Sequence, residues 1–318
     1  MVSKHKDEAG KWAHRLAGFC DFIVESALER ADITAILICG PTASGKSSLA
    51  MCVAERLNGL IVSADSMQLY RGFDIGTAKP TQTDQKRITH EMIDILDPDQ
   101  SYSVALYVES VARILKEAQQ SKKQIVICGG TGQYISALLD GISYAKHSRD
   151  HLLRAEIERE VDDSGLEILW QKLVKLDPQA AQTIAPSDRR RIVRFHEQYR
   201  LTGKTRTVIN QQSRLPDSLH RFVAYYIDPG KAELNQRIID RVDQMLAAGL
   251  VEETRSLLSK YPDISLQPYS GIGYRETIAY LQGQFSLSET RDWIIIHTRQ
   301  YAKRQRTWFR PRTDLFRF

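Results

Sequence analysis

A glycine-rich segment near the N-terminus has the residue spacing of a phosphate-binding loop. Residues 40–47 read Gly-Pro-Thr-Ala-Ser-Gly-Lys-Ser, directly after an apolar run at 33–39 and before a helical pattern at 47–57. The two glycines let the backbone turn so that successive N–H groups face one anion, and the lysine adds a full positive charge. We therefore expect a polyphosphate to be bound by Gly40, Thr42, Ala43, Ser44, Gly45, Lys46 and Ser47.

The metal site that usually accompanies such a loop is incomplete in this sequence. A nucleoside triphosphatase needs a second acidic residue at a strand end, but the apolar run at 125–128 leads into Gly-Gly-Thr-Gly-Gln at 129–133. The Ser47 hydroxyl, the phosphates and water remain as ligands for Mg²⁺. The glycine run is no dinucleotide fingerprint either, because Ile135 occupies the third glycine position. The phosphate loop alone thus leaves the reaction open.

One carboxylate, Asp65, comes directly after a second predicted strand at 60–63. Ligands of open parallel sheets gather at the carboxyl ends of the strands, so we expect Asp65 to face the phosphate loop. In that place it can accept a proton from an attacking nucleophile. A second interpretation stays open, in which the Asp65 side chain only caps a local turn.

Strand and helix patterns alternate around these residues. Strands are predicted at 33–39, 60–63 and 125–128, with helices at 47–57 and about 104–119 between them. This alternation indicates an α/β fold, a P-loop NTPase-like parallel sheet flanked by helices, with a mostly helical insertion domain.

The insertion begins after Gly141, where polar helical patterns broken by prolines replace the alternation. A strand pattern returns at 222–227, and a capping box from Ser286 to Glu289 opens a last helix that ends near Phe309. We divide the chain into an N-terminal extension at 1–31, a core at 32–142 and 221–318, and an insertion at 143–220. Apolar residues on one helical face of the extension predict that it docks on the core: Ala13, Leu16, Phe19, Phe22, Ile23 and Leu28.

The composition excludes several classes of protein. The chain has 318 residues, of which 42% are hydrophobic, as in ordinary globular proteins. The longest charge-free stretch, 124–139, is shorter than the roughly 20 apolar residues that cross a membrane, so no spanning helix is expected. The four cysteines, Cys20, Cys39, Cys52 and Cys128, form no Cys-x-x-Cys pair, so we expect no zinc site. We also expect their thiols to be reduced, as is usual in a cytoplasmic protein.

The net charge of +5 is distributed unevenly along the chain. Residues 32–142 include 10 basic and 12 acidic residues, whereas residues 143–318 include 29 basic and 22 acidic ones. The basic excess lies in the second half, where an arginine run at 189–191 and a basic last helix could contact the phosphates of a nucleic acid. A charge run is more often a solvated helix face, and that alternative stays open.

Several segments together make the sequence resemble a known enzyme family. In chain order they are Gly-Pro-Thr-Ala-Ser-Gly-Lys-Ser (40–47), Ser-Ala-Asp-Ser-Met-Gln-Leu-Tyr (63–70), Asp-Ile-Gly-Thr-Ala-Lys-Pro (74–80), His-Glu-Met-Ile-Asp-Ile-Leu-Asp-Pro (90–98) and Gly-Gly-Thr-Gly-Gln-Tyr (129–134). Later segments agree with them, at 237–245, 271–275 and 298–308. Over roughly residues 33–310 the chain is similar to tRNA dimethylallyltransferases, also called tRNA isopentenyltransferases. It resembles the bacterial type, since the zinc finger of eukaryotic relatives does not follow Trp308.

The resemblance implies transfer of a dimethylallyl group from dimethylallyl pyrophosphate to N6 of the adenosine 3′ of the anticodon in tRNA. The phosphate loop would hold the pyrophosphate leaving group with Mg²⁺, and Arg237 or Arg241 would clamp it. A solvated helix face is the alternative for these two arginines. Asp65 would act as the base for the adenine amine, and Thr131 would bind the pyrophosphate or orient the base. The alternative for Thr131 is an ordinary threonine in a turn.

The resemblance also implies that tRNA binds through its anticodon stem-loop. The target adenine must flip out of its stack to reach the donor. Candidate tRNA contacts are Asp65, Ser66, Met67, Gln68, Arg190, Arg191, Arg194, Gly273, Tyr274 and Arg275. We expect a monomer that works in the cytoplasm without a membrane. Two other functions stay open, a small-molecule or nucleotide kinase that consumes ATP and a P-loop RNA-binding module without chemistry.

Overall fold

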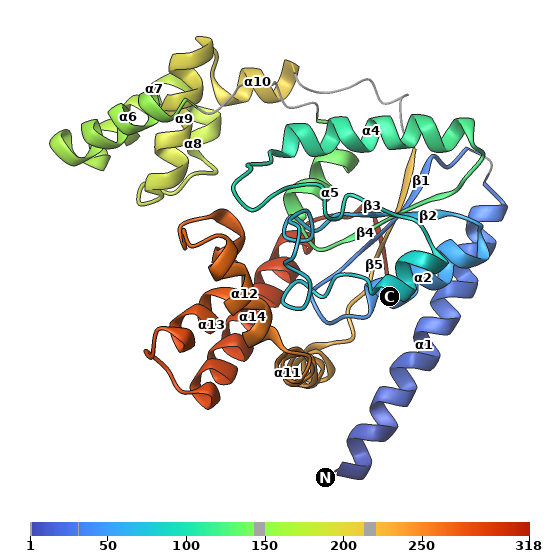
Figure 1. Cartoon of the computed structure of the whole chain (residues 1–318). Helices are drawn as coiled ribbons and strands as arrows, with labels where there is room; N and C mark the ends of the chain where they lie inside the picture. The colour runs from blue at the N-terminus through green and yellow to red at the C-terminus, as the bar shows by residue number, and fades with distance from the viewer. Residues whose placement is uncertain (1, 31, 143–149, 213–220) are drawn as a thin grey trace. The chain divides into compact units, whose positions relative to one another are not determined.

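The computed structural model describes most of the chain and divides it into two compact units (Figure 1). The described residues are 2–30, 32–142, 150–212 and 221–318. By their contacts, the first unit comprises residues 1–103, 110–136 and 220–318, and the second comprises residues 104–109 and 137–219. The insertion boundaries expected at 143 and 220 lie outside the described residues.

The first unit is built on a parallel sheet, which has six strands in the described chain. The strands are β1 (Ala35–Cys39), β2 (Leu60–Ser63), β3 (His90–Glu91), β4 (Ile125–Gly129), β5 (Phe222–Tyr226) and β6 (Leu315–Arg317). They lie in the order β3-β2-β4-β1-β5-β6. Four of them coincide with predicted strands, and the α/β fold class is confirmed. The strands β3 and β6 were not predicted, because two or three residues give no measurable periodicity.

Helices flank this sheet and supply side chains to its carboxyl edge. Those of the first unit are α1 (Val2–Leu28), α2 (Lys46–Arg56), α3 (Gln82–Arg87), α11 (Lys231–Ala247), α12 (Leu250–Lys260), the 3₁₀ turn η1 (Gln267–Ser270), α13 (Tyr274–Leu281) and α14 (Leu287–Phe309). Two more helices pass from one unit into the other, α4 (Val104–Gln120) and α5 (Gly132–Leu139). The predicted capping box opens α14, since Ser286 Oγ accepts the Glu289 N–H at 3.2 Å and the Ser286 N–H donates to the Glu289 carboxylate at 2.8 Å.

The helix predicted in the N-terminal extension is α1, and it packs on α2 and the sheet. Its buried side chains are Trp12, Cys20, Ile23 and Val24. Phe22 and Leu28, which the periodicity placed on the same face, are 47% and 73% exposed. The docked face is therefore narrower than the sequence predicted.

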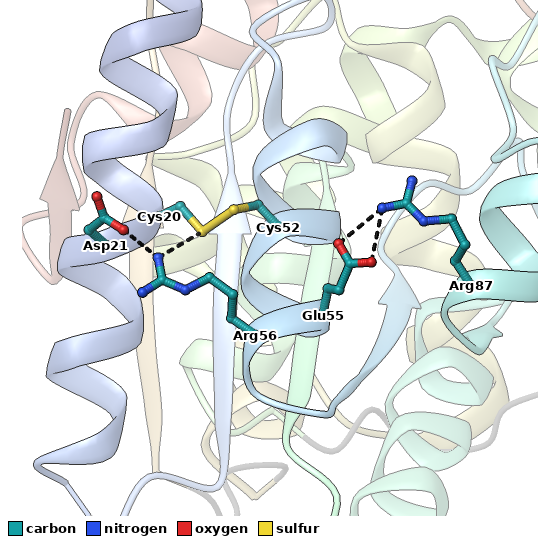
Figure 2. Close-up of a disulfide and its surroundings, with 6 residues drawn as sticks. All are labelled: Cys20, Asp21, Cys52, Glu55, Arg56 and Arg87. Atoms are coloured by element: carbon teal, nitrogen blue, oxygen red, sulfur yellow. Dashed lines mark hydrogen bonds and ion pairs between the residues drawn. A yellow bond between two sulfur atoms is a disulfide. The ribbon is translucent and has the colours of Figure 1, made fainter.

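A disulfide joins Cys20 of α1 to Cys52 of α2 (Figure 2). The expectation of reduced thiols is wrong for this pair, whereas Cys39 and Cys128 are free and buried. The two bonded cysteines are 32 positions apart in sequence. Only the packing of α1 on α2 brings their Cα atoms to 6.4 Å, a separation that a disulfide can bridge.

The second unit is helical in its described part, in agreement with the expected helical insertion. Its helices are α6 (His151–Ser164), α7 (Leu166–Leu176), α8 (Pro178–Ala181), α9 (Arg189–Thr202) and α10 (Arg206–Gln212). Ile157, Leu169 and Ile192 lie in an apolar core of this unit alone. In neither unit does a helix of the described chain combine the length and apolarity needed to cross a bilayer.

Candidate active site

Three loops meet at the carboxyl edge of the sheet. In the register of the strands, Cys39 lies opposite Gly129, and Ser63 lies opposite Cys128. The loops that follow β1, β4 and β2 therefore begin side by side, as expected for a ligand site in an open parallel sheet. They line a cavity of about 240 Å³. Helix α11 contributes Arg241 to its wall, and helix α14 contributes Tyr301 and Gln305.

The phosphate loop has the backbone geometry that its sequence predicts. Gly45 is left-handed, with φ of 92°. Gly40 lies so close to the residue that follows β5 that an added Cβ atom would be 2.4 Å from the Ile227 carbonyl oxygen. Lys46 begins α2, so the positive end of the helix dipole points at the loop. The Lys46 ammonium also donates to the Pro41 carbonyl at 3.3 Å.

Two cations and one carboxylate face one another in this cavity. Burial lowers the pKa of Lys46; the Arg241 guanidinium lowers it further, while Asp65 opposes this shift. Burial also lowers the pKa of Arg241, again against the attraction of Asp65. Positive charge therefore exceeds negative charge among these three groups, and an anion that bound there would relieve the repulsion between the cations.

One side chain of α14 connects two of the three loops. Gln305 is buried; its Oε1 accepts the backbone N–H of Thr42 at 2.8 Å, and its Nε2 donates to the Gly130 carbonyl at 3.0 Å. The side-chain amide offers an acceptor and a donor on two separate atoms, so it can bind both loops at once. Sequence reasoning missed Gln305, and the available signal was its spacing of three or four positions from Tyr301, Ala302, Trp308 and Phe309 on one face of the predicted helix.

Asp65 both caps a local turn and lines the cavity, so the structure combines the two roles that the sequence left open. Its Oδ1 accepts the Met67 N–H at 2.9 Å, and its own N–H donates to Ser63 Oγ at 3.3 Å, so it does cap the turn after β2. Among the described residues, Oδ2 has no hydrogen-bond partner, and Asp65 lines the cavity. The cap thus fixes the carboxylate and leaves one oxygen to act on a ligand.

Thr131 and Tyr301 lie beside Asp65. Thr131 Oγ1 accepts the Ser66 N–H at 3.0 Å, which ties the loop after β4 to the loop after β2. Tyr301 lines the same cavity, and burial together with the Asp65 carboxylate raises the pKa of Tyr301. Tyr301 therefore stays protonated and can donate. It was not predicted as a site residue, although it lies four positions before Gln305 on the same helical face.

The two predicted clamp arginines on α11 differ in their surroundings. Arg237 lies 3.6 Å from the Glu233 carboxylate, one turn earlier on the helix. Within the described chain Arg241 has no such ion pair, and it lines the same cavity as Lys46 and Asp65. This arrangement favours Arg241 as the residue that contacts pyrophosphate.

The Gln68 side chain holds the loop after β2. Its Oε1 accepts the Ser63 hydroxyl at 2.8 Å, and its Nε2 donates to the carbonyls of Thr77 and Ala78 at 3.2 and 3.3 Å. All of these bonds are internal to the protein. A contact between Gln68 and a base, as predicted from the sequence, would require some of them to be exchanged.

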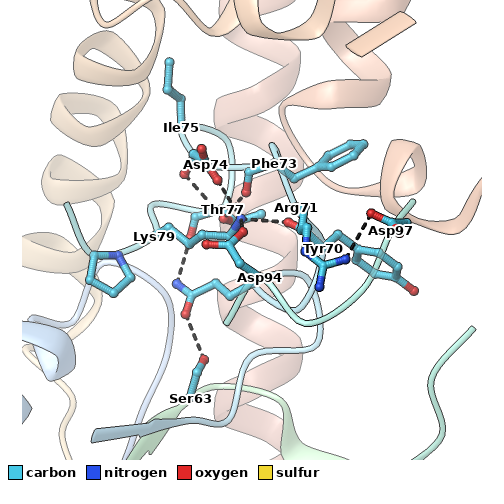
Figure 3. A network of polar contacts seen from close by, with 12 residues as sticks. Ser63, Tyr70, Arg71, Phe73, Asp74, Ile75, Thr77, Lys79, Asp94 and Asp97 are labelled. Carbon is cyan, nitrogen blue, oxygen red and sulfur yellow. Dashed lines mark hydrogen bonds and ion pairs between the residues drawn. The ribbon is translucent and has the colours of Figure 1, made fainter. Parts of the chain in front are cut away.

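Lys79 anchors the far side of the same loop (Figure 3). Its ammonium donates to the Tyr70 carbonyl at 2.7 Å and forms ion pairs with Asp74 at 2.5 Å and Asp94 at 2.6 Å. The Lys79 side chain is only 3% exposed. It lines a second cavity of about 1210 Å³ beside the phosphate loop. That volume exceeds the roughly 300–1,000 Å³ of small-molecule sites and suits a larger ligand.

The predicted RNA contact at Tyr274 disagrees with its position in the structure. Tyr274 is 0% exposed; its hydroxyl donates to Glu253 at 2.7 Å and accepts the Gly76 N–H at 3.1 Å. The ring thus serves internal packing, and its burial argues against a contact with RNA. Gly273 is the N-cap of α13, and Arg275 is 44% exposed although it pairs with Glu276 at 2.5 Å. These two residues stay candidate contacts.

The three predicted arginines of the insertion lie on α9 of the second unit. Arg191 is 3.3 Å from Asp188, and Arg194 is 2.8 Å from the buried Glu197. Arg190 is exposed and has no ion pair within the described part of the chain. Arg190 is therefore the most available of the three for a phosphate.

A metal ion would find few protein ligands in this site. Among the residues that the structure describes, no group of three or more His, Cys, Asp or Glu side chains could hold one. The exposed Ser47 at the start of α2 lines the cavity with Asp65 and Lys46. This donor set fits a Mg²⁺ ion that takes most of its oxygen ligands from bound phosphates and water.

Comparisons with known proteins identify the family. The IPP transferase family model matches residues 68–312. A tRNA dimethylallyltransferase from Geobacter metallireducens is 43% identical over 280 residues, which cover 88% of this chain and 90% of that protein. The chain belongs to the IPP transferase family. A tRNA dimethylallyltransferase from Pelotomaculum thermopropionicum is also 43% identical, over 277 residues that cover 86% and 87% of the two chains.

Solved structures of IPP transferase relatives share the fold. A tRNA isopentenylpyrophosphate transferase from Bacillus halodurans matches with a TM-score of 0.64 and 36% identity, over 89% of both chains. A eukaryotic dimethylallyltransferase acting on tRNA matches with a TM-score of 0.74 and 25% identity, over 89% of this chain and 73% of that one. The resemblance inferred from the sequence motifs is thereby confirmed.

Proposed function

We propose that this IPP transferase-family chain transfers a dimethylallyl group from dimethylallyl pyrophosphate to N6 of the adenosine 3′ of the anticodon in tRNA. The proposal rests on one cavity in which Lys46 and Arg241 face the carboxylate of Asp65. Cations there stabilise a departing diphosphate, and a carboxylate there accepts a proton. Relatives named tRNA dimethylallyltransferase support the choice of donor and acceptor.

The donor side is the phosphate loop. Its residues Gly40, Thr42, Ala43, Ser44, Gly45, Lys46 and Ser47 form a cradle for the pyrophosphate, whose negative charge increases as its bond to carbon breaks. Arg241 supplies the opposing cation, and Gln305 keeps the Thr42 peptide in position. When bound, Mg²⁺ would neutralise part of the charge on the pyrophosphate oxygens, and the Ser47 hydroxyl is the protein ligand that we propose for it.

The acceptor side is the carboxylate of Asp65. N6 of adenine forms a bond to the allylic carbon, the bond from that carbon to the pyrophosphate oxygen breaks, and the N6 proton moves to Asp65 Oδ2. The Met67 N–H holds the other oxygen, so the base stays aligned. Thr131 and Tyr301 are the neighbouring groups that position the base and the pyrophosphate.

tRNA is the second substrate in this proposal. The second unit with its Arg190, Arg191 and Arg194, and the exposed Arg275 of the first unit, are the proposed phosphate contacts. The excess of basic over acidic residues in 143–318 supports an RNA surface in this half of the chain. Ser66, Met67 and Gln68 are the proposed contacts of the flipped adenine. Because its substrate is tRNA, we propose that the protein acts in the cytoplasm.

Release of pyrophosphate tests this function. The full chain is incubated with Mg²⁺ and dimethylallyl pyrophosphate, with and without unmodified tRNA, and pyrophosphate is measured. We expect release only when both substrates are present, in equal amount to the prenyl groups found on tRNA. Release without tRNA would indicate hydrolysis and contradict the proposal.

A kinase is the alternative that the same assay separates. Its phosphate loop and the Asp after β2 would act on ATP instead of an allylic donor. If the protein were a kinase, replacing the donor by ATP would give ADP and no prenylated nucleoside. Our proposal predicts no tRNA-dependent consumption of ATP.

A further inference from the structure

The N-terminal helix α1 touches the phosphate loop directly. The indole N–H of Trp12 donates to the Ser44 carbonyl at 3.0 Å, and both residues are buried. An added Cβ atom on Gly45 would lie 2.9 Å from Leu16 Cδ1 and 3.3 Å from Trp12 Nε1. Side chains of α1 thus contact two consecutive residues of the loop. The reaction proposed above assigns no role to these α1 side chains.

The hydrogen bond from Trp12 acts on the peptide that joins Ser44 to Gly45. This peptide is planar and trans, so its C=O and its N–H point in opposite directions. A donor that holds the Ser44 carbonyl from outside the loop therefore directs the Gly45 N–H to the opposite side. Such fixed amides favour anion binding because no reorientation is needed when the ligand arrives.

The Trp12 ring also reaches the helix of the proposed clamp. The Arg237 guanidinium lies over it, with Cζ 6.0 Å from the ring centroid. The Arg15 guanidinium also lies over this ring, 4.9 Å from the same centroid. These contacts fix the plane of the indole, and with it the direction of the N–H bond.

Two links fasten α1 to α2, the helix into which the phosphate loop leads (Figure 2). One is the disulfide between Cys20 and Cys52, and the other is the ion pair between Asp21 and Arg56. Phe19 also stacks on Phe318, with ring centroids 4.3 Å apart. Trp12 is two helical turns before Cys20, so the covalent link restrains the helix that presents the indole.

We propose that α1 is part of the donor site. Trp12 is a positioning residue that presets the phosphate loop for a diphosphate group, and the Cys20–Cys52 disulfide keeps α1 in the position that allows this. The inference rests on the proposed function only in requiring that the loop binds a diphosphate.

The first test replaces Trp12 by phenylalanine, which keeps an aromatic ring and removes the N–H donor. The dissociation constant of inorganic pyrophosphate with Mg²⁺ is measured by calorimetry on the full chain. Loss of one hydrogen bond predicts a weakening between about twofold and tenfold. The KM for dimethylallyl pyrophosphate should rise by the same factor, and the KM for tRNA should not change.

Trp293→Phe is the matched control, because Trp293 lies on α14 and is 40% exposed. It should leave the affinity for pyrophosphate unchanged. An unchanged pyrophosphate affinity in Trp12→Phe would overturn the proposal. So would an equal rise in both KM values together with a lower unfolding temperature, since that pattern indicates a general loss of structure.

The second test addresses the disulfide. The variant with both Cys20→Ser and Cys52→Ser should bind pyrophosphate more weakly than the wild type and should gain no further defect when Trp12→Phe is added. A dithiol, which reduces the disulfide to two thiols and is itself oxidised, should weaken binding by the wild type and leave the double variant unaffected. Wild-type affinity in the double variant would contradict the fastening role.

The pyrophosphate measurement separates this inference from the proposed function. If the wild type binds pyrophosphate but transfers no prenyl group, the proposed function is wrong. The effect of Trp12→Phe on pyrophosphate binding would then still decide the role of α1.

Discussion

Gln305 and Thr42 are 263 positions apart in sequence, yet the Gln305 side-chain oxygen accepts the Thr42 backbone N–H at 2.8 Å. Thr42 belongs to the phosphate loop, and the Gln305 amide nitrogen donates to Gly130 in the loop after β4 at 3.0 Å. The end of the chain thus helps to build a site whose sequence signature lies near its beginning.

Replacing Gln305 by leucine tests this link. The change leaves the Thr42 N–H and the Gly130 carbonyl without their partner, and an unpaired buried group costs about 1–3 kcal/mol. We expect prenyl transfer at low donor concentration to fall by about tenfold to a hundredfold. Gln300→Leu is the control, since Gln300 is exposed on the same helix and should tolerate the change. Equal rates for the two variants would contradict a role for Gln305.

Asp65→Asn tests the proposed base. Asparagine keeps an oxygen for the Met67 N–H but cannot take the N6 proton, so kcat should fall by about 10²–10⁴-fold. The affinities for pyrophosphate and tRNA should be nearly unchanged. Asp84→Asn serves as the control, because Asp84 lines the same cavity but its carboxylate accepts the Thr81 N–H in the capping box of α3. If Asp65→Asn retained its kcat, another group would have to remove the proton.

Arg241→Gln and Arg237→Gln form a matched pair on one helix. Arg241 faces Lys46 and Asp65, whereas Arg237 pairs with Glu233. Removing the Arg241 charge should weaken pyrophosphate binding by about tenfold or more, because hydrogen bonds to charged groups contribute about 1.5–3 kcal/mol. The Arg237 variant should lose less affinity in the same calorimetric titration. The reverse order would assign the clamp to Arg237.

The sequence predicted the parts of the site that are local in the chain. The loop at 40–47 and the strand before Asp65 have short-range patterns, and the alternation of strands and helices indicates a parallel sheet. Tyr301 and Gln305 gave no such pattern, since their roles depend on how α14 lies against two distant loops. The burial of Tyr274 could not be predicted from the sequence for the same reason, because its partners Glu253 and Gly76 belong to other segments.

The lowered pKa of Lys46 predicts how pyrophosphate binding depends on pH. In the free protein burial lowers this pKa, and bound pyrophosphate favours the charged ammonium and raises it again. Affinity should be highest below the lowered pKa and should decline as the pH rises through it, because binding then takes up a proton.

Calorimetry in two buffers of different ionisation enthalpy measures this proton uptake. In Lys46→Arg the guanidinium stays charged, so this variant accounts for the ionisation of pyrophosphate itself. Equal proton uptake by the wild type and Lys46→Arg at alkaline pH would contradict the assignment to Lys46.

Mapping the modified nucleotide tests the central claim most directly. Unmodified tRNA is incubated with the full chain, dimethylallyl pyrophosphate and Mg²⁺, and the anticodon-loop fragment is then sequenced by mass spectrometry. The account predicts one dimethylallyl group on N6 of the adenosine 3′ of the anticodon. An unmodified adenosine at that position, or a prenyl group elsewhere in the tRNA, would contradict it.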